Sequence, residues 1–196
     1  MTASIAEPAL DQLFREARTR NGWDTAPLGD ELIRQIYDLA KFGPTSANIS
    51  PARFVWAYSA EAKEKLGALA TPGNAAKIKQ APVTVIIGYD LDFPELVPKL
   101  FPHNPGAKDW FQDPVARETA AFRNGTLQGA YLMLAARALG LDCGPMSGFS
   151  NAAVDEAFFA GTNIKSNFIC LIGHGTDENL FERLPRLSFE AANTVL

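Results

Sequence analysis

Two runs of almost unbroken apolar residues constrain the fold of this chain more than any other feature. Residues 83–89 read VTVIIGY and residues 167–172 read NFICLI, and both runs are rich in β-branched or aromatic side chains. A strand with one face in water alternates apolar and polar residues, whereas a strand covered on both faces does not. The sequence therefore predicts two central strands with further layers on both sides. Residues 53–58, RFVWAY, predict a third strand.

Helical patterns surround these strands. Apolar residues recur at three- and four-residue spacing over 10–17, over 32–40 and, longest of all, over 115–139. Asp30 precedes the second pattern where an N-cap belongs, and Gly140 follows the third where a helix usually ends. The apolar positions of the third pattern extend widely around the helix, which predicts burial on more than one side. Few strands and much helix favour a layered α+β fold.

The size and charge of the chain narrow its class. With 196 residues and no repeat or linker, it is expected to form a single domain over 1–196. A formal net charge of −4 lacks the basic field of nucleic-acid binders, and no long apolar run predicts a membrane span. The N-terminus has no secretory pattern, and Cys143 and Cys170 fit a reducing compartment, so we expect a cytoplasmic protein. Both cysteines are expected to be small core residues.

Hydrolytic and metal-binding motifs are not found. In 144–148, GPMSG, the first glycine is one position too far from the serine for a nucleophile elbow. His103 and His174 are the only imidazoles, and neither stands at a metal-ligand spacing from a cysteine. Gly173-His174-Gly175 is at most a fragment of a dinucleotide fingerprint. The sequence therefore predicts neither a catalytic triad nor a metal site.

Four short segments do combine turn residues with cations and amides. They are 18–22 (RTRNG), 43–48 (GPTSAN), 73–77 (GNAAK) and 144–149 (GPMSGF). Each one alone is explained as readily by a solvated helix end or a capped turn. Their occurrence together indicates a polar binding site. The segment 90–113, rich in proline and aromatic residues, is expected to form a lid or binding loop; its alternative role is dimer packing.

The order of these motifs resembles that of the nitroreductase family. The resemblance spans nearly the whole chain and rests on Thr45-Ser46-Ala47-Asn48 followed by Pro51, on Asn74-x-x-Lys77 ahead of Ala81-Pro82-Val83, on the helix-to-loop passage 138–149, and on the closing motifs 172–175 and 183–186. It implies a nitroreductase-like fold, in which a central, mainly antiparallel sheet is flanked by helices. It also implies a homodimer, non-covalently bound FMN, and NADPH or NADH as the hydride donor.

The resemblance further implies which residues contact FMN. Arg18 and Arg186 would bind the phosphate with Arg20 assisting, since a guanidinium can meet two phosphate oxygens at once. Asn21 stands where many relatives carry a further cation, so the register within 18–22 stays open. The Lys77 ammonium would stabilise negative charge near flavin N1. The expected cofactor-binding set is Arg18, Thr19, Arg20, Thr45, Ser46, Asn48, Asn74, Lys77, Pro145, Met146, Ser147, Gly148 and Arg186.

Two further features of the resemblance concern assembly and catalysis. Ser46 and Asn48 are expected to reach the flavin from the partner subunit or from the opposite wall. No catalytic side chain is expected, because flavin N5 carries the hydride in a two-stroke reaction.

The expected substrate is a small aldehyde. Residues 43–54, 144–149 and 184–189 resemble a branch of the family regarded as malonic semialdehyde reductases of pyrimidine breakdown, which form 3-hydroxypropanoate. Arg53 and Arg123 are candidates for steering an acidic substrate, and each has a surface ion pair as its alternative role. Three other hypotheses stay open: a nitroaromatic or quinone reductase, a protein that stores or senses flavin without rapid turnover, and a cofactor-free structural domain.

Overall fold

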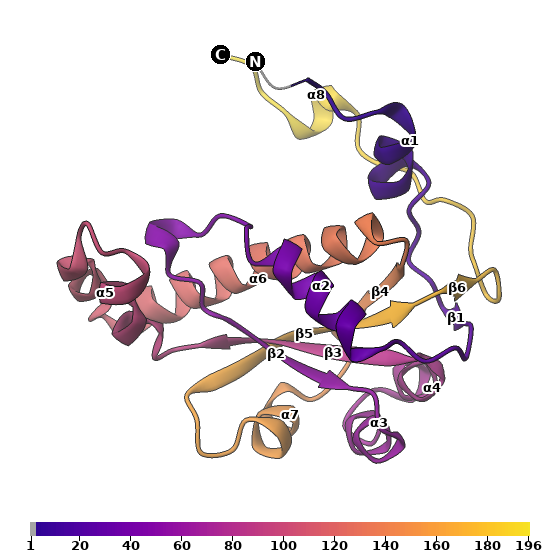
Figure 1. Ribbon diagram of the computed structural model, residues 1–196, viewed down its shortest axis with the longest axis horizontal. Coiled ribbons are helices and arrows are strands. Elements are labelled where there is room, and N and C mark those ends of the chain that lie inside the picture. The colour runs from indigo at the N-terminus through magenta and orange to yellow at the C-terminus, as the bar shows by residue number, and fades with distance from the viewer. Residues whose placement is uncertain (1–2) are drawn as a thin grey trace.

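A computed structural model describes residues 3–196, and within them the core is a four-stranded antiparallel sheet (Figure 1). The strand order is β2-β3-β5-β4, in which β2 is Ala52–Ala57, β3 is Val83–Asp90, β5 is Ile164–Gly173 and β4 is Asp142–Met146. The two apolar runs therefore form the two inner strands, which confirms that prediction.

Helices cover both faces of this sheet, as Figure 1 shows. On one face, α2 (Asp30–Ala40) and α6 (Pro114–Ala138) pack over a cluster that includes Val85 and Ile172. On the other, α3 (Ala60–Gly67), α4 (Pro72–Gln80) and α7 (Asn151–Phe158) bury side chains against a cluster around Ile86 and Leu171. The expected layered α+β fold with an antiparallel sheet between helices is confirmed.

The long helix α6 packs closely against the sheet at Gly125 and Gly129. A Cβ atom at Gly129 would lie 2.6 Å from a ring carbon of Phe168, so a larger residue would force the helix away from the sheet. The helix ends at Ala138, and Gly140, two residues later, has a φ of +80°, which confirms the predicted stop. On its outer side, Phe122 and Leu127 are about half exposed. One chain thus buries only one side of α6, and the predicted second side stays open.

The segment 90–113 folds into helical turns around a small core of its own. It contains η3 (Phe93–Leu96), α5 (Val97–Leu100) and η4 (Pro105–Phe111). Phe93 and Phe111 pack edge to face, with ring centroids 4.8 Å apart, in a cluster that also holds Ile49. The segment is therefore ordered and packs beside the turn that precedes β2.

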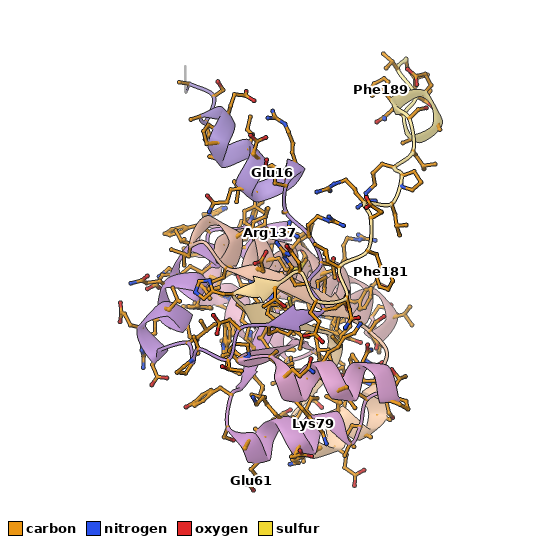
Figure 2. The ribbon with its side chains drawn as sticks, turned by 90° about the vertical axis from the view of Figure 1, so that its right-hand side faces the viewer. Glu16, Glu61, Lys79, Arg137, Phe181 and Phe189 are labelled. Carbon is orange, nitrogen blue, oxygen red and sulfur yellow. The ribbon has the colours of Figure 1, made fainter. Side chains whose placement is uncertain are left out.

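A short two-stranded sheet joins an early and a late segment of the chain. The strand β1 (Gly22–Trp23) pairs with β6 (Gly175–Thr176), with Gly22 opposite Thr176. The N-terminal pattern forms α1 (Glu7–Leu10) and η1 (Asp11–Arg15), and the tail carries α8 (Phe189–Ala192). Residues 181–196 are exposed, and Figure 2 shows the tail projecting from the body beyond Phe181 toward Phe189.

Two local expectations were tested directly by the structure. The N-cap assignment is wrong: Asp30 is the first residue of α2, Gly29 is its N-cap, and no side chain caps this end. The assignment of Cys143 and Cys170 to the core is confirmed. The Cys143 thiol and burial raise the pKa of Cys170 well above its usual value, which keeps that thiol protonated and unreactive.

No helix in residues 3–196 combines the length and apolar character needed to cross a bilayer.

Candidate functional site

Four arginines line one cavity between the N-terminal segment and the C-terminal tail. The cavity has a volume of about 580 Å³, and Glu182 is the one carboxylate on its described lining. The four arginines are Arg18, Arg137, Arg183 and Arg186, and we call the cavity that they line the arginine pocket. Figure 2 shows Arg137 and the start of the tail at Phe181 on the same side of the molecule.

The guanidiniums of the arginine pocket donate only to backbone carbonyls in the described part of the chain. Arg183 Nη2 donates to Arg15 O at 2.5 Å, Arg137 Nη1 donates to Leu13 O at 3.2 Å, and Arg18 donates to Phe181 O. Within residues 3–196 none of the four forms an ion pair with a carboxylate. Carbonyl partners orient these cations without neutralising them, so the cavity suits a multiply charged anion such as a phosphate.

The pocket is assembled by strand pairing near the sheet edge. Arg20 N donates to Cys143 O at 3.2 Å, and Thr19 bridges Cys143, so residues 18–20 run beside β4. The β1–β6 pairing then brings the tail alongside the same segment. Arg18 and Arg186, which the sequence placed together, do share the cavity, and Thr19 and Asn21 line it with them.

Arg20 points away from this cavity and is already paired. Its Nη1 lies 2.5 Å from Asp177 Oδ1 and its Nε lies 3.4 Å from Asp142 Oδ1. Burial lowers the pKa of Arg20, but the two carboxylates outweigh that effect and raise it above the usual value. The Arg20 charge therefore serves to join β4 to the segment after β6. We do not retain it among the phosphate contacts.

A second group of candidate residues, which we call the α4 wall, lies where Asn74 and Lys77 of α4 meet residues 145–148 at the end of β4 and just after it. Asn74 Nδ2 donates to Gly148 O at 3.1 Å, and Thr71 N donates to the same oxygen at 2.9 Å. A Cβ atom at Gly148 would lie 2.5 Å from Asn74 Nδ2, so only glycine fits without moving that amide. The structure thus brings together two motifs, 73–77 and 144–149, that the sequence had placed in one site.

Lys77 stands one turn beyond Asn74 on α4 and is half-buried. Within residues 3–196 it has no carboxylate in ion-pair range, whereas Lys79 on the same helix pairs with Glu64 at 2.8 Å. Pro145 and Met146 end β4, and Ser147 is exposed on the loop that follows. The α4 wall therefore offers an uncompensated cation and backbone groups that can approach a ligand closely.

The predicted Ser-x-Asn motif forms a strained turn. Ala47, Asn48 and Ser50 have φ values of 46°, 51° and 40°, in the left-handed region that residues with a Cβ rarely adopt. Thr45 Oγ1 accepts from Ser50 N at 3.1 Å, and Asn48 Nδ2 donates to Leu100 O at 2.8 Å. We call residues 45–50 the strained turn.

The strained turn is remote from the arginine pocket in one chain. Asn124 of α6 accepts a hydrogen bond from the turn, and Arg137 of the same helix lines the pocket. At about 1.5 Å per residue, Asn124 and Arg137 are about 20 Å apart along the helix axis. A single chain therefore does not bring all the predicted cofactor contacts together.

The two candidates for substrate steering have different surroundings. Arg53 Nη2 lies 2.6 Å from Asp90 Oδ2, and its Nη1 donates to the carbonyls of Ser50 and Ala52. The charge of Arg53 is thus neutralised between β2 and β3, which matches its alternative role as a member of an ion pair. Arg123 is exposed on α6, beside the residue that holds the strained turn, and pairs with no carboxylate in the described chain.

Comparison with known proteins identifies the family. The family model described as Nitroreductase family matches residues 15–175. The chain belongs to the nitroreductase family. A protein of Caulobacter vibrioides provisionally named an NADH dehydrogenase/NAD(P)H nitroreductase is 64% identical over 194 residues, covering 99% of this chain and 100% of the relative. A similarly named protein of Ralstonia pickettii is 58% identical over 198 residues, covering 100% of both chains.

Solved structures show the same fold at much lower sequence identity. A provisional nitroreductase of Exiguobacterium sibiricum, solved in complex with FMN, has a TM-score of 0.87 and 20% identity and covers 100% of both chains. A provisional Bacillus subtilis nitroreductase has a TM-score of 0.85 and 18% identity, covering 97% of this chain and 100% of the other. These likenesses support the fold assignment.

Four residues that the structure places at these candidate sites were absent from the predicted set of contacts. Arg183 belongs to the closing motif 183–186, so its signal was present, but only Arg186 was chosen. Arg137 lies within the predicted helix 115–139, and the sequence did not single it out. Asn124 and Gln128 lie within an otherwise apolar helix, where a buried amide at each of two positions one turn apart was the available signal.

Proposed function

We propose that this nitroreductase-family chain is an FMN-dependent NAD(P)H oxidoreductase and that the arginine pocket holds the FMN phosphate. The observation that carries this proposal is the convergence of Arg18, Arg137, Arg183 and Arg186 on one cavity, with no carboxylate of residues 3–196 paired to them. A phosphate dianion meets such a donor set through charge-assisted hydrogen bonds. The FMN in the Exiguobacterium structure and the NAD(P)H-dependent names of close relatives support the same assignment.

The α4 wall is proposed to receive the isoalloxazine ring. FMN, when bound, supplies the chemistry by accepting a hydride from a nicotinamide and passing one to the substrate through N5. Asn74 would hydrogen-bond the polar edge of the ring, and backbone N–H groups of 146–148 would approach N5 closely beside Gly148. The Lys77 ammonium would stabilise negative charge near N1. The chain's own contribution is thus orientation and electrostatic tuning.

A homodimer is proposed to complete this site. The outer side of α6, with Phe122, Leu127 and Tyr131, and the exposed tail with Leu184 and Leu187 are apolar surfaces that one chain leaves in water. Covering them with a second copy would also bring the partner's strained turn to the flavin, since one chain attaches its turn to α6 at Asn124, about 20 Å along the helix from Arg137 of its own pocket.

Hybrid dimers test this arrangement. One chain carries Arg18→Ala with Arg186→Ala, and the other carries Ser46→Ala with Asn48→Ala. If each site combines the pocket of one subunit with the turn of the other, the hybrid contains one intact site and regains about half the wild-type activity per dimer, while both parent homodimers stay weak. A hybrid no more active than its parents would show that each chain builds its site alone.

We propose malonic semialdehyde as the physiological acceptor, with Arg123 steering its carboxylate. Arg123 is favoured over Arg53 because the Arg53 charge is already paired with Asp90. Steady-state rates with malonic semialdehyde, a nitroaromatic compound and a quinone decide between acceptors. A preference of several orders of magnitude for the aromatic acceptors would reject the aldehyde assignment in favour of a nitroaromatic or quinone reductase.

Anaerobic mixing with NADPH or NADH separates an enzyme from a flavin store or sensor. Bleaching of the flavin absorbance within seconds is expected for the enzyme. A protein that retains its yellow colour under both nicotinamides would instead be a binding protein.

A further inference from the structure

We infer that Asn124 and Gln128 are positioning residues that hold the strained turn in the shape that presents Ser46 and Asn48. The inference rests on the proposed function, because it takes the strained turn to contact the flavin. Neither amide reaches the arginine pocket or the α4 wall, so neither belongs to the predicted set of contacts.

The two amides form a pair on one face of α6. They stand one helical turn apart, and their residues are 2% and 8% exposed, respectively. Asn124 Oδ1 accepts from Ser46 N at 2.8 Å, and Gln128 Oε1 accepts from Ala52 N at 2.8 Å. Together they hold the backbone near the start of the strained turn, at Ser46, and just after its end, at Ala52.

The orientation of the Asn124 amide is fixed by a second bond. Its Nδ2 donates to Ala120 O at 2.8 Å, one turn back on the same helix. The oxygen must therefore face the turn, and the amide cannot rotate without losing both bonds. The helix itself is a firm base, because Gly125 and Gly129 let it lie directly on the sheet.

A turn with three left-handed residues persists only where its surroundings impose that conformation. An apolar side chain at position 124 would remove the acceptor of the part-buried Ser46 N–H, and one at position 128 would leave the buried N–H of Ala52, just after the turn, without a partner. The turn would then relax toward ordinary φ values, and the side chains of Ser46 and Asn48 would move away from the positions they hold here. Loss of either amide should weaken flavin binding although neither side chain contacts the flavin.

Asn124→Asp tests this role by making it depend on pH. The protonated carboxyl reproduces both bonds, because one oxygen accepts from Ser46 N while the other donates to Ala120 O. The ionised form instead sets a negative oxygen against that carbonyl. Burial favours the neutral carboxyl, so the turn is expected to be held at low pH. At higher pH, repulsion between the ionised oxygen and Ala120 O should turn the carboxylate away and loosen its hold on Ser46 N.

The measurement is FMN affinity of the apoprotein between pH 5 and pH 8, by flavin fluorescence. Asn124→Asp should bind FMN within about twofold of wild type at pH 5 and about tenfold more weakly at pH 8, the effect of one broken hydrogen bond. Asn124→Leu should be weakened at every pH. Hydrogen exchange of the 45–52 peptide should accelerate in parallel, which gives a readout independent of activity.

Asn167→Leu is the matched control. It removes a 2.8 Å side-chain hydrogen bond that Asn167 donates to Thr126 Oγ1 of α6, and Asn167 has no hydrogen bond to the turn. If Asn124→Asp follows the wild-type pH profile, or if Asn167→Leu weakens FMN as much as Asn124→Leu, the positioning role is wrong. A wild-type protein that binds no FMN would instead refute the proposed function, while faster exchange at 45–52 in Asn124→Leu would still support the amide clamp itself.

Discussion

The arginine pocket and the strained turn are both assigned to one flavin, yet they are built in opposite ways. The pocket gathers four cations that donate to carbonyls and keep their charge, near the surface and the exposed tail. The turn contains no charged side chain and has three left-handed residues; one buried amide bonds to Ser46 within it and a second bonds to Ala52 just after it. Binding at the pocket therefore depends on charge, whereas binding at the turn depends on conformation. Substitutions in the two regions should therefore differ in the property that they change as well as in the size of their effect.

Removing charge from the pocket should have the largest effect. Arg18→Ala with Arg186→Ala should weaken FMN binding by about 100-fold or more, since each charge-assisted hydrogen bond contributes about 1.5–3 kcal/mol. The loss should shrink as salt rises, because salt screens exposed charges. Titration of the apoprotein with FMN at two ionic strengths measures both. Arg34→Ala, an exposed arginine on α2, is the control. Equal weakening by both variants would assign the effect to net charge alone.

Lys77→Ala should separate chemistry from binding. Reduction of bound FMN by NADPH should slow about tenfold, the equivalent of about 1.4 kcal/mol, while FMN affinity changes by about threefold or less. The two-electron midpoint potential should fall by about 30 mV for the same energy. Stopped-flow reduction and a potential titration measure these. Lys79→Ala on the same helix should change neither, because its charge is paired with Glu64. Equal loss of FMN in Lys77→Ala and Arg186→Ala would invalidate the division of roles.

Gly148→Ala tests the fit of the α4 wall. The new methyl group would lie 2.5 Å from Asn74 Nδ2 and would displace that amide. We expect FMN affinity to fall about threefold to tenfold and stability to fall by about 1 kcal/mol, in the range of a broken hydrogen bond. Gly73→Ala is the control, since a Cβ atom there meets nothing within 4 Å. A Gly148→Ala protein with wild-type affinity would remove this wall from the site.

The smallest effect is expected at the strained turn itself. Ala47→Gly relieves a left-handed residue, so the free energy of unfolding should stay level or rise by up to about 1 kcal/mol. Ala76→Gly, in the exposed interior of α4, should lower it by about 1 kcal/mol. Urea denaturation of both variants measures the difference. If the two substitutions destabilise the protein equally, the turn carries no strain.

Much of the fold followed from local patterns in the sequence. The run 83–89 matched β3 and the pattern 115–139 matched α6, because burial on both faces and a long amphipathic period leave strong signals. The strand β4 gave no such signal, since Asp142–Met146 is short and contains Gly144 and Pro145 at the sheet edge. Short elements of this kind are fixed by their neighbours in the fold.

The candidate site was predictable only as a set of motifs. The sequence grouped Asn74 with Gly148 and Arg18 with Arg186, and the structure brings each pair together. It did not reveal that Arg20 is neutralised by Asp142 and Asp177, because those partners come from distant segments. It also gave no sign of strain at the turn, since alanine and serine have no preference for positive φ. Charge pairing and backbone strain are tertiary properties.

The most direct test of the whole account compares FMN with riboflavin on the wild-type apoprotein. The two ligands share the ring and the ribityl chain and differ only in the phosphate. If the arginine pocket holds that phosphate, FMN should bind about 100-fold or more tightly than riboflavin, as expected for two or more charge-assisted hydrogen bonds. Equal affinities for the two ligands would contradict the account, because the four arginines would then serve some other anion.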